Sequence, residues 1–404
     1  MLRPTIMLFA LLVVTGTVTC AKDFKVRLAQ GHANKLGATP GQIGGPSGPG
    51  PVPIAMKPFP CQVLSSGNHV ISNARLVGDG TNDCLVISDT ANVIIENSEI
   101  VHVATGVRIM GEGKVIVRGN RIHDFTHTGI RVGRSSRSTV DYIGADVLIQ
   151  DNDIYDSRTG CATYDVDVRN CRGPRGNGVT IARIKGASIV GNRITNTEFG
   201  CLRVITSGED TIVKDNYCEG PKYDAGFYFE FGWRGGLVSG NHLSGKSRGS
   251  RGMIFTNCNE DSRQAHVVDN IVEGFKGPWQ IGGCEVVAEK NTIDCDDPST
   301  AAVERGYFGI ALNIRRGAGI HTNQAKENLI RNCQIGIAIG QDNSGAGSPV
   351  RVENNMFKDV RTPITGYVFA FRMLWNHAAH QPLIGSHVIR NNRDVLTQQT
   401  VDPQ

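Results

Sequence analysis

One short motif recurs eleven times along this 404-residue chain and constrains its fold more than any other feature. Each copy has an apolar strand, a polar pair ending in Asn and a further apolar residue, as in Val115–Ile122 and Val147–Ile154. The spacing returns to about 22 residues with longer inserts, which is typical of a solenoid. The Asn position falls at Asn120, Asn152, Asn192, Asn216, Asn241, Asn270, Asn291, Asn355 and Asn392, with Ser98 and Cys333 in the same place in two further copies.

The residue before the Asn predicts a sharp turn in each copy. It is Gly, Asp or Asn in most copies, for example Gly119, Asp151 and Asn354. These types tolerate a left-handed backbone. We therefore expect the following Asn side chains to point inward and to bond the coils above and below, because turn backbone groups need partners when they are buried. The stacked copies predict an Asn ladder.

A second strand follows most copies and begins at a Gly. The leading residues are Gly106, Gly129, Gly178, Gly226, Gly252, Gly309 and Gly336. Two or three short strands in about 22 residues leave no room for a helix in the repeat. From roughly Asn68 to Asn392 the chain resembles the right-handed parallel β-helix repeats of the pectin-lyase-like superfamily. This resemblance implies an all-β, single-stranded right-handed parallel β-helix solenoid of about eleven coils.

The N-terminal segment predicts export. One charge at Arg3 precedes the apolar run Ile6–Val14 and small residues up to Ala21, a pattern typical of a secretory signal peptide at residues 1–21. The run is too short to span a bilayer, and we expect no membrane span elsewhere. A lipoprotein anchored at Cys20 is the alternative. The expected location is therefore secreted or periplasmic.

The remaining chain divides by composition. Residues 22–60 are rich in Gly and Pro, which predicts a flexible segment. The β-helix domain is expected at residues 61–395, and residues 396–404 form a tail. The formal net charge is only +4, so no general attraction to nucleic acid follows. We expect a monomer.

Ten cysteines would remain after cleavage at Ala21, and an even number in an exported chain favours disulfides. Alignment of successive coils places Cys258 and Cys284 in stacked positions about 4.8 Å apart, within disulfide range. Cys161 and Cys171 share one insert and could close it. Four others could not be paired from the sequence, and one of these, Cys333, could equally be a small ladder residue. These four are Cys201, Cys218, Cys295 and Cys333.

Outward positions of the Gly-led strand predict a column of polar side chains along the solenoid. Five successive coils contribute Arg108, Arg131, Thr180, Arg203 and Tyr228, with Ile205, Glu230 and Thr256 two residues further along. The outward residues that follow in the column, Gln280, Ala311 and Ala338, carry no charge. The coil rise of about 4.8 Å is close to the length of one sugar unit, so the column could follow a polysaccharide.

The stacking of Arg108 over Arg131 favours the binding of an anion between their side chains. Like charges opposite each other on a sheet are destabilising. A bound carboxylate would relieve this repulsion, because Arg binds carboxylates through two hydrogen bonds. The alternative is that Glu230 and loop Asp residues neutralise the column.

Two inserts, Gly133–Ala145 and Ser157–Gly176, are expected to wall this column, because solenoid inserts often lie on the binding face. They would bring Arg134, Tyr164 and Arg172 to the substrate. A surface flap is the alternative. The pair Asp165 and Asp167 could ligate Ca²⁺, which takes carboxylate oxygens. No cofactor is otherwise required.

In lyases and epimerases that act on uronates, an Arg or an ion neutralises the carboxylate and a side chain removes the adjacent proton. His127, Arg131, Arg203 and Tyr228 could fill these catalytic roles. Glu230 shares one face of a strand with Tyr228. We expect His127 in a turn just before Gly129, where a solvated surface His is the alternative.

The sequence thus predicts an exported carbohydrate-active β-helix protein that acts on an acidic, uronate-containing polysaccharide by β-elimination or C5 epimerisation. A glycoside hydrolase is one alternative, which needs two carboxylates facing one bond. A non-catalytic glycan-binding or surface protein is the other. The Asp-Pro-His-Asp signature of mannuronan epimerases does not occur in the chain.

Overall fold

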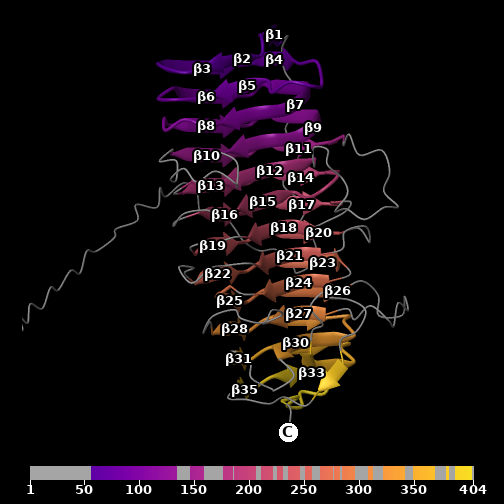
Figure 1. Cartoon of the computed structure of the whole chain (residues 1–404). Helices are drawn as coiled ribbons and strands as arrows, with labels where there is room; N and C mark the ends of the chain where they lie inside the picture. The colour runs from indigo at the N-terminus through magenta and orange to yellow at the C-terminus, as the bar shows by residue number, and fades with distance from the viewer. Residues whose placement is uncertain are drawn as a thin grey trace, which may run out of the picture. The chain divides into compact units, whose positions relative to one another are not determined.

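The computed structural model divides the chain into two units, Met1–Gly44 and Gly45–Gln404, and every described residue belongs to the second. The elements within it are β-strands, β1 to β36, which follow one another along the stack in chain order (Figure 1). The described residues are 56–133, 146–158, 176–184, 186–205, 211–221, 225–230, 235–245, 251–256, 264–275, 277–282, 284–295, 308–312, 322–341, 349–368, 379–381 and 387–402.

Each coil contributes strands to three walls, and all pairings between coils are parallel apart from one hairpin-like pair near the C-terminus. The first wall is a sheet of twelve strands: β3 Asn68–Ser72, β6 Asn92–Glu96, β8 Val115–Arg118, β10 Val147–Gln150, β13 Ala187–Val190, β16 Ile212–Lys214, β19 Gly236–Ser239, β22 Ala265–Val268, β25 Val286–Glu289, β28 Asn323–Lys326, β31 Val350–Glu353 and β35 Val388–Arg390.

The second wall follows the Asn turn. It contains β1 Lys57–Pro58, β4 Ala74–Val77, the first parts of β7 Glu99–Ile109 and β9 Arg121–Val132, then β11 Asp153–Tyr155, β14 Arg193–Thr195, β17 Tyr217–Glu219, β20 His242–Ser244, β23 Ile271–Phe275, β26 Thr292–Cys295, β29 Leu329–Arg331, β32 Met356–Lys358 and β36 Arg393–Asp394.

The third wall is formed by the Gly-led strands. It contains β2 Gln62–Leu64, β5 Leu85–Ile87, the last parts of β7 and β9, then β12 Asn177–Ala182, β15 Leu202–Ile205, β18 Ala225–Glu230, β21 Arg251–Thr256, β24 Gly277–Gly282, β27 Phe308–Leu312, β30 Ile335–Gln341 and β33 Thr362–Val368, with β34 Ala379–Gln381 antiparallel to β33. Because β7 and β9 run through both walls, these two walls form one continuous 24-stranded sheet.

The Asn ladder between the first and second walls is confirmed. In each rung the backbone nitrogen and Nδ2 of one Asn donate to Oδ1 of the next, as from Asn216 to Asn241 at 3.0 Å each. Both side chains are buried. The residues before them have the predicted left-handed backbone, with φ of 54° at Asp215 and 64° at Gly240.

One predicted rung was wrong. Asn328, not Cys333, continues the ladder, and it donates to Oδ1 of Asn355 at 2.9 Å. Cys333 lies at the next corner of the same coil, after Asn332 with φ of 55°. Most corners use left-handed Asn, Asp or Gly residues, so Asn332–Cys333 resembles a ladder pair, whereas the true rung at Asn328 follows Glu327, with φ of 53°.

The two ends of the ladder differ. At the N-terminal end, the backbone nitrogen of Ala74 donates to Oγ of Ser98 at 3.1 Å, so the first coil needs no Asn. At the C-terminal end, Asn392 donates from its backbone nitrogen and Nδ2 to Oδ1 of Asp402 at 3.1 and 2.7 Å. A carboxylate therefore takes the place of a further rung.

Three disulfides lie within the described residues. They pair Cys61 with Cys84, Cys201 with Cys218, and Cys295 with Cys333. The last two resolve the four cysteines that the sequence left unpaired, and bonding to Cys295 explains the position of Cys333. Cys161 and Cys171 lie outside the described residues.

The predicted bond between Cys258 and Cys284 stays a prediction. Cys284 is disulfide-bonded, whereas Cys258 lies outside the described residues. Because β21 and β24 pair in the register that the sequence predicted, with Met253 beside Trp279, non-reducing peptide mapping is expected to recover Cys258 linked to Cys284. Recovery of Cys284 bonded to any other cysteine would contradict this register.

A close approach of successive coils fixes the start of the third wall. A Cβ added to Gly129 would lie 2.6 Å from Cγ2 of Ile154 and 2.7 Å from the carbonyl oxygen of Gly178. Both distances are too short for any side chain. Gly is therefore required where β9 passes from the second wall to the third. The close contact with the next coil fixes the position of the backbone at this corner.

Candidate functional site

The outward column on the third wall has the predicted register. Arg108 pairs with Arg131, Arg131 with Thr180, Thr180 with Arg203, and Arg203 with Tyr228. The inward neighbours, such as Ile130 and Val179, are buried in the core. Alternation along each strand thus places the five polar side chains on one outer face.

The accessible part of this column is short. From Ile254 to Ala338 the outward positions are buried: Ile254 is 2% exposed and Gln280 is 5% exposed. Arg108, Arg131, Arg203 and Tyr228 are half-buried. Contact with a ligand from solvent is therefore concentrated on the coils from Arg108 to Tyr228.

Two of the three arginines in the column have carboxylate partners. Nη1 of Arg108 lies 2.8 Å from Oδ2 of Asp83, in the loop before β5. Nε of Arg203 donates to Oε1 of Glu230 at 3.0 Å, and Glu230 is only 3% exposed. The guanidinium carbon of Arg203 also lies 5.5 Å from the centre of the Tyr228 ring, within cation–π range. The neutralising alternative thus holds for Arg108 and Arg203.

Arg131 differs from its two neighbours. In the described part of the chain its guanidinium makes no hydrogen bond or ion pair, and its Nε is buried without a partner. Burial lowers the pKa of Arg131, and the charge of Arg108 lowers it further against the opposing effect of Asp83. A partly buried cation without a hydrogen-bonded partner is costly. The column therefore holds an uncompensated positive charge between two compensated ones.

His127 lies beside this charge, but not in the predicted turn. It belongs to β9, which runs without interruption from Arg121 to Val132. The pairing of β7 with β9 shifts register between Val103 and Thr105, whose partners are Phe125 and Thr128. His127 therefore lies in this irregular part of the strand and not in a turn. Burial lowers the pKa of His127, and the charges of Arg131 and Arg108 lower it further against the opposing effect of Asp83. Its imidazole is thus kept neutral.

The structure does not test several predicted residues. Arg134, Tyr164, Arg172, Asp165 and Asp167 lie outside the described residues, as do most of both inserts. Thr180 is described and is 8% exposed, and its Oγ1 has no hydrogen-bond partner there. Asp83 is a residue that the sequence reasoning missed, because it lies in a loop without periodicity.

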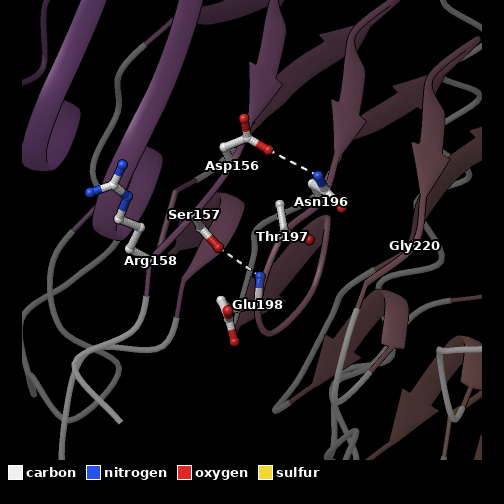
Figure 2. A pocket seen from close by; sticks show the side chains of 7 residues that line it. All are labelled: Asp156, Ser157, Arg158, Asn196, Thr197, Glu198 and Gly220. Carbon is white, nitrogen blue, oxygen red and sulfur yellow. Dashed lines mark hydrogen bonds between the residues drawn. The ribbon is translucent and has the colours of Figure 1, made fainter. Parts of the chain in front are cut away.

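A polar pocket was also missed. It lies at the corner between the second and third walls and has a volume of about 240 Å³ (Figure 2). Its lining residues come from three successive coils: Asp156, Ser157, Arg158, Asn196, Thr197, Glu198 and Gly220. The sequence feature that could have revealed it is the Gly or short polar residue directly after a second-wall strand, as at Asp156, Asn196 and Gly220, a pattern that resembles the Asn turn.

Metal-binding groups are sparse in the described part of the chain. It contains no group of three or more His, Cys, Asp or Glu side chains that could hold a metal ion. The seven described cysteines are disulfide-bonded. Nor does any helix there have the length and apolar character needed to cross a membrane.

The stacked walls and inward ladder define a parallel β-helix repeat protein, and family models agree. The model described as "Right handed beta helix region" matches residues 62–218. The model described as "Periplasmic copper-binding protein (NosD)" matches residues 146–381, more than half of the chain. The chain therefore belongs to the NosD family and has the right-handed β-helix fold that its repeats predicted.

The described residues do not fit the copper ion in the family's description. Copper favours imidazole and sulfur ligands. The described cysteines are consumed by disulfides. In three described histidines one ring nitrogen contacts a carboxylate instead: His102 contacts Asp124 at 3.3 Å, His123 contacts Glu99 at 3.3 Å, and His242 contacts Glu273 at 2.8 Å.

The solved structures that match this chain are distant in sequence. DFA-IIIase from Arthrobacter chlorophenolicus A6 in complex with DFA-III is 13% identical, with a TM-score of 0.27, over 80% of this chain and 83% of that one. A second structure of DFA-IIIase from the same organism is 11% identical with a TM-score of 0.24, over 80% of this chain and 84% of that one. No curated protein matches the chain.

Proposed function

We propose that this protein is exported and acts on an acidic, uronate-containing polysaccharide by β-elimination or C5 epimerisation. The observation that carries the proposal is the uncompensated guanidinium of Arg131 between the paired Arg108 and Arg203. A carboxylate is the anion that a planar guanidinium binds best through two hydrogen bonds. One uronate carboxylate at Arg131 would neutralise the column.

The neutral His127 would supply the base. A carboxylate neutralised by Arg131 makes the proton on the adjacent carbon more acidic, and His127 can then remove it. In elimination the released electron pair forms the C4–C5 double bond as the bond to O4 breaks. In epimerisation a proton returns to the same carbon from the opposite face. Tyr228, oriented by Arg203, is the proposed proton donor.

The other predicted residues take supporting roles in the proposal. Arg108 and Thr180 would contact sugar units on either side of Arg131. Glu230 holds Arg203 through its ion pair, so we assign it to positioning this arginine rather than to proton transfer. Arg134, Tyr164 and Arg172 would contact the substrate from the inserts, and Asp165 and Asp167 could ligate Ca²⁺.

Export is supported by the disulfides, which persist in oxidising compartments. We propose a secreted or periplasmic protein with residues 1–21 removed, residues 22–60 as a flexible segment, residues 61–395 as the β-helix domain and residues 396–404 as a tail. A lipoprotein anchored at Cys20 is the alternative.

Turnover tests the proposed reaction. Polygalacturonate, polymannuronate and polyglucuronate should be incubated with the protein, beside a neutral polysaccharide as control. The absorbance of unsaturated products reports elimination, and NMR of the recovered polymer reports epimerisation. Binding of a uronate polymer without either product would identify a non-catalytic glycan-binding protein. Release of saturated fragments would identify a glycoside hydrolase.

Replacing Arg131 with Ala should weaken the binding of the active uronate polymer about tenfold to a hundredfold, as expected for loss of a hydrogen-bonded charge. Isothermal titration calorimetry measures the effect. Arg118→Ala is the matched control, because Arg118 is also an outward Arg but lies on the first wall and pairs with Glu96 at 2.9 Å. Equal affinities of the two variants would place the site elsewhere.

A further inference from the structure

The corner pocket is built around an interrupted row of side chains. At this corner a left-handed residue follows three successive second-wall strands, with φ of 53° at Asp156, 54° at Asn196 and 61° at Gly220. Nδ2 of Asn196 donates to Oδ1 of Asp156 at 2.9 Å, as the dashed line in Figure 2 shows. The next position is Gly220, which has no side chain to continue the row.

Space is open where the next side chain would stand. A Cβ added to Gly220 would meet no atom within 4 Å. By contrast, a Cβ on Gly129 or Gly178, at the start of the third wall, would collide with a backbone carbonyl. The side-chain amide of Asn196 donates a hydrogen bond to Asp156, and no hydrogen bond to Oδ1 of Asn196 occurs in the described part of the chain. An acceptor thus borders the open position.

The floor of the pocket is also polar. Ser157 is 6% exposed, and its Oγ donates to the carbonyl of Gly176 and accepts from the backbone nitrogen of Glu198 at 2.6 Å. Thr197 is 1% exposed, and its hydroxyl has no hydrogen-bond partner among the described residues. A buried hydroxyl without a partner is unusual and indicates that something else supplies one.

The groups around the pocket favour a ligand that carries hydroxyl groups. Asp156 and Glu198 contribute carboxylates and Asn196 contributes an amide. The guanidinium of Arg158 is already paired, because its Nε contacts Asp124 at 2.5 Å. This mixture of donors and acceptors suits groups that do both. Sugar hydroxyls donate to carboxylates and accept from amides and hydroxyls.

We propose that this pocket binds one neutral sugar residue through its hydroxyl groups, with a ligand hydroxyl in the open position beside Gly220. The site does not depend on Arg131 or on the reaction proposed above. It lies at the corner that precedes β12, β15 and β18, the strands that carry Thr180, Arg203 and Tyr228. A neutral residue bound there would anchor a mixed glycan near the cationic column.

Filling the open position tests the proposal. Asn tolerates a left-handed backbone, and Asn196 and Asn332 already adopt it at this corner. Gly220→Asn should therefore fold and extend the row to Asn196. Saturation-transfer NMR with the methyl glycosides of glucose, galactose, mannose and fructose should detect binding to the unchanged protein and no binding to this variant.

Gly67→Asn is the matched control, because Gly67 also has a left-handed backbone, with φ of 81°, and an added Cβ there would meet only Nε2 of His69, at 3.9 Å. It should bind the glycosides as the unchanged protein does. The proposal is overturned if no glycoside binds the unchanged protein or if Gly220→Asn binds as well as Gly67→Asn. Binding that disappears on addition of a chelator would also overturn it, because it would reveal a cation site.

Thr197→Val provides a second variant that keeps the shape of the side chain. Since the Thr197 hydroxyl has no partner in the described structure, its removal should leave the thermal midpoint unchanged or raise it. Glycoside affinity should fall about two- to tenfold, as expected for one neutral hydrogen bond. A lower midpoint with unchanged affinity would assign the hydroxyl to folding and contradict the proposal.

Discussion

Replacing Asn216 with Ala should lower the free energy of unfolding by about 3–4 kcal/mol, because each buried polar group left without a partner costs about 1–3 kcal/mol. Oδ1 of Asn216 accepts from the backbone nitrogen and Nδ2 of Asn192 at 3.0 and 2.9 Å. Its Nδ2 donates to the carbonyl of Ile189 and to Asn241. Alanine would leave these buried donors and acceptors without hydrogen-bond partners. Denaturation with guanidinium chloride measures the loss.

Asn68→Ala is the matched control for this loss. Asn68 is exposed in β3 and accepts one hydrogen bond, from Nδ2 of Asn92 at 3.0 Å. Because water can replace that bond, its substitution should change the free energy of unfolding by less than about 0.5 kcal/mol. Similar losses for both variants would show that the ladder contributes no more than a surface contact.

His127→Gln should lower kcat about a hundredfold to ten-thousandfold on the active uronate polymer, the range for a lost general base. Gln can still form hydrogen bonds, but it cannot take up a proton at neutral pH. Affinity for the polymer should remain close to that of the unchanged protein, since Arg131 still binds the carboxylate. Steady-state kinetics combined with calorimetry separates the two effects. A loss of affinity with unchanged kcat would remove His127 from proton transfer.

The pH profile gives an independent test of the same base. Burial, Arg131 and Arg108 lower the pKa of His127 from its usual value of 6.5, and Asp83 opposes them only in part. The neutral form is the base, so activity should rise with pH through a midpoint below 6.5 and persist above it. Arg108→Gln removes one of these charges and should move the midpoint upward. A profile that is unchanged in Arg108→Gln would indicate another titrating group.

The parts of the fold that the sequence predicted are those encoded by local pattern. The alternation of apolar residues and the left-handed residue before each Asn specify the strands and the first corner, which is why the register from Arg108 to Tyr228 could be derived. Cys333 was misplaced because the second corner uses the same residue types. His127 was placed in a turn because sequence spacing cannot reveal that β9 continues through the corner with a shifted register.

The partners in the candidate site could not be derived in this way. Asp83 reaches Arg108 from an irregular loop, and the pairing of Arg203 with Glu230 depends on side-chain conformations that spacing does not encode. That Arg131 differs from both neighbours in lacking a partner among the described residues therefore emerges only from the structure. The corner pocket was hidden for a different reason, since its defining feature is the absence of a side chain at Gly220.

The Asn ladder also has an electrical direction. Every rung from Asn120 to Asn392 points its amide nitrogen toward the C-terminal neighbour and its oxygen toward the N-terminal one. The side-chain dipoles therefore add, as peptide dipoles do along an α-helix, and leave a partial positive charge at the C-terminal end. The carboxylate of Asp402 lies there. It accepts hydrogen bonds but offers none, so the ladder presents no donor row to which a second molecule could add.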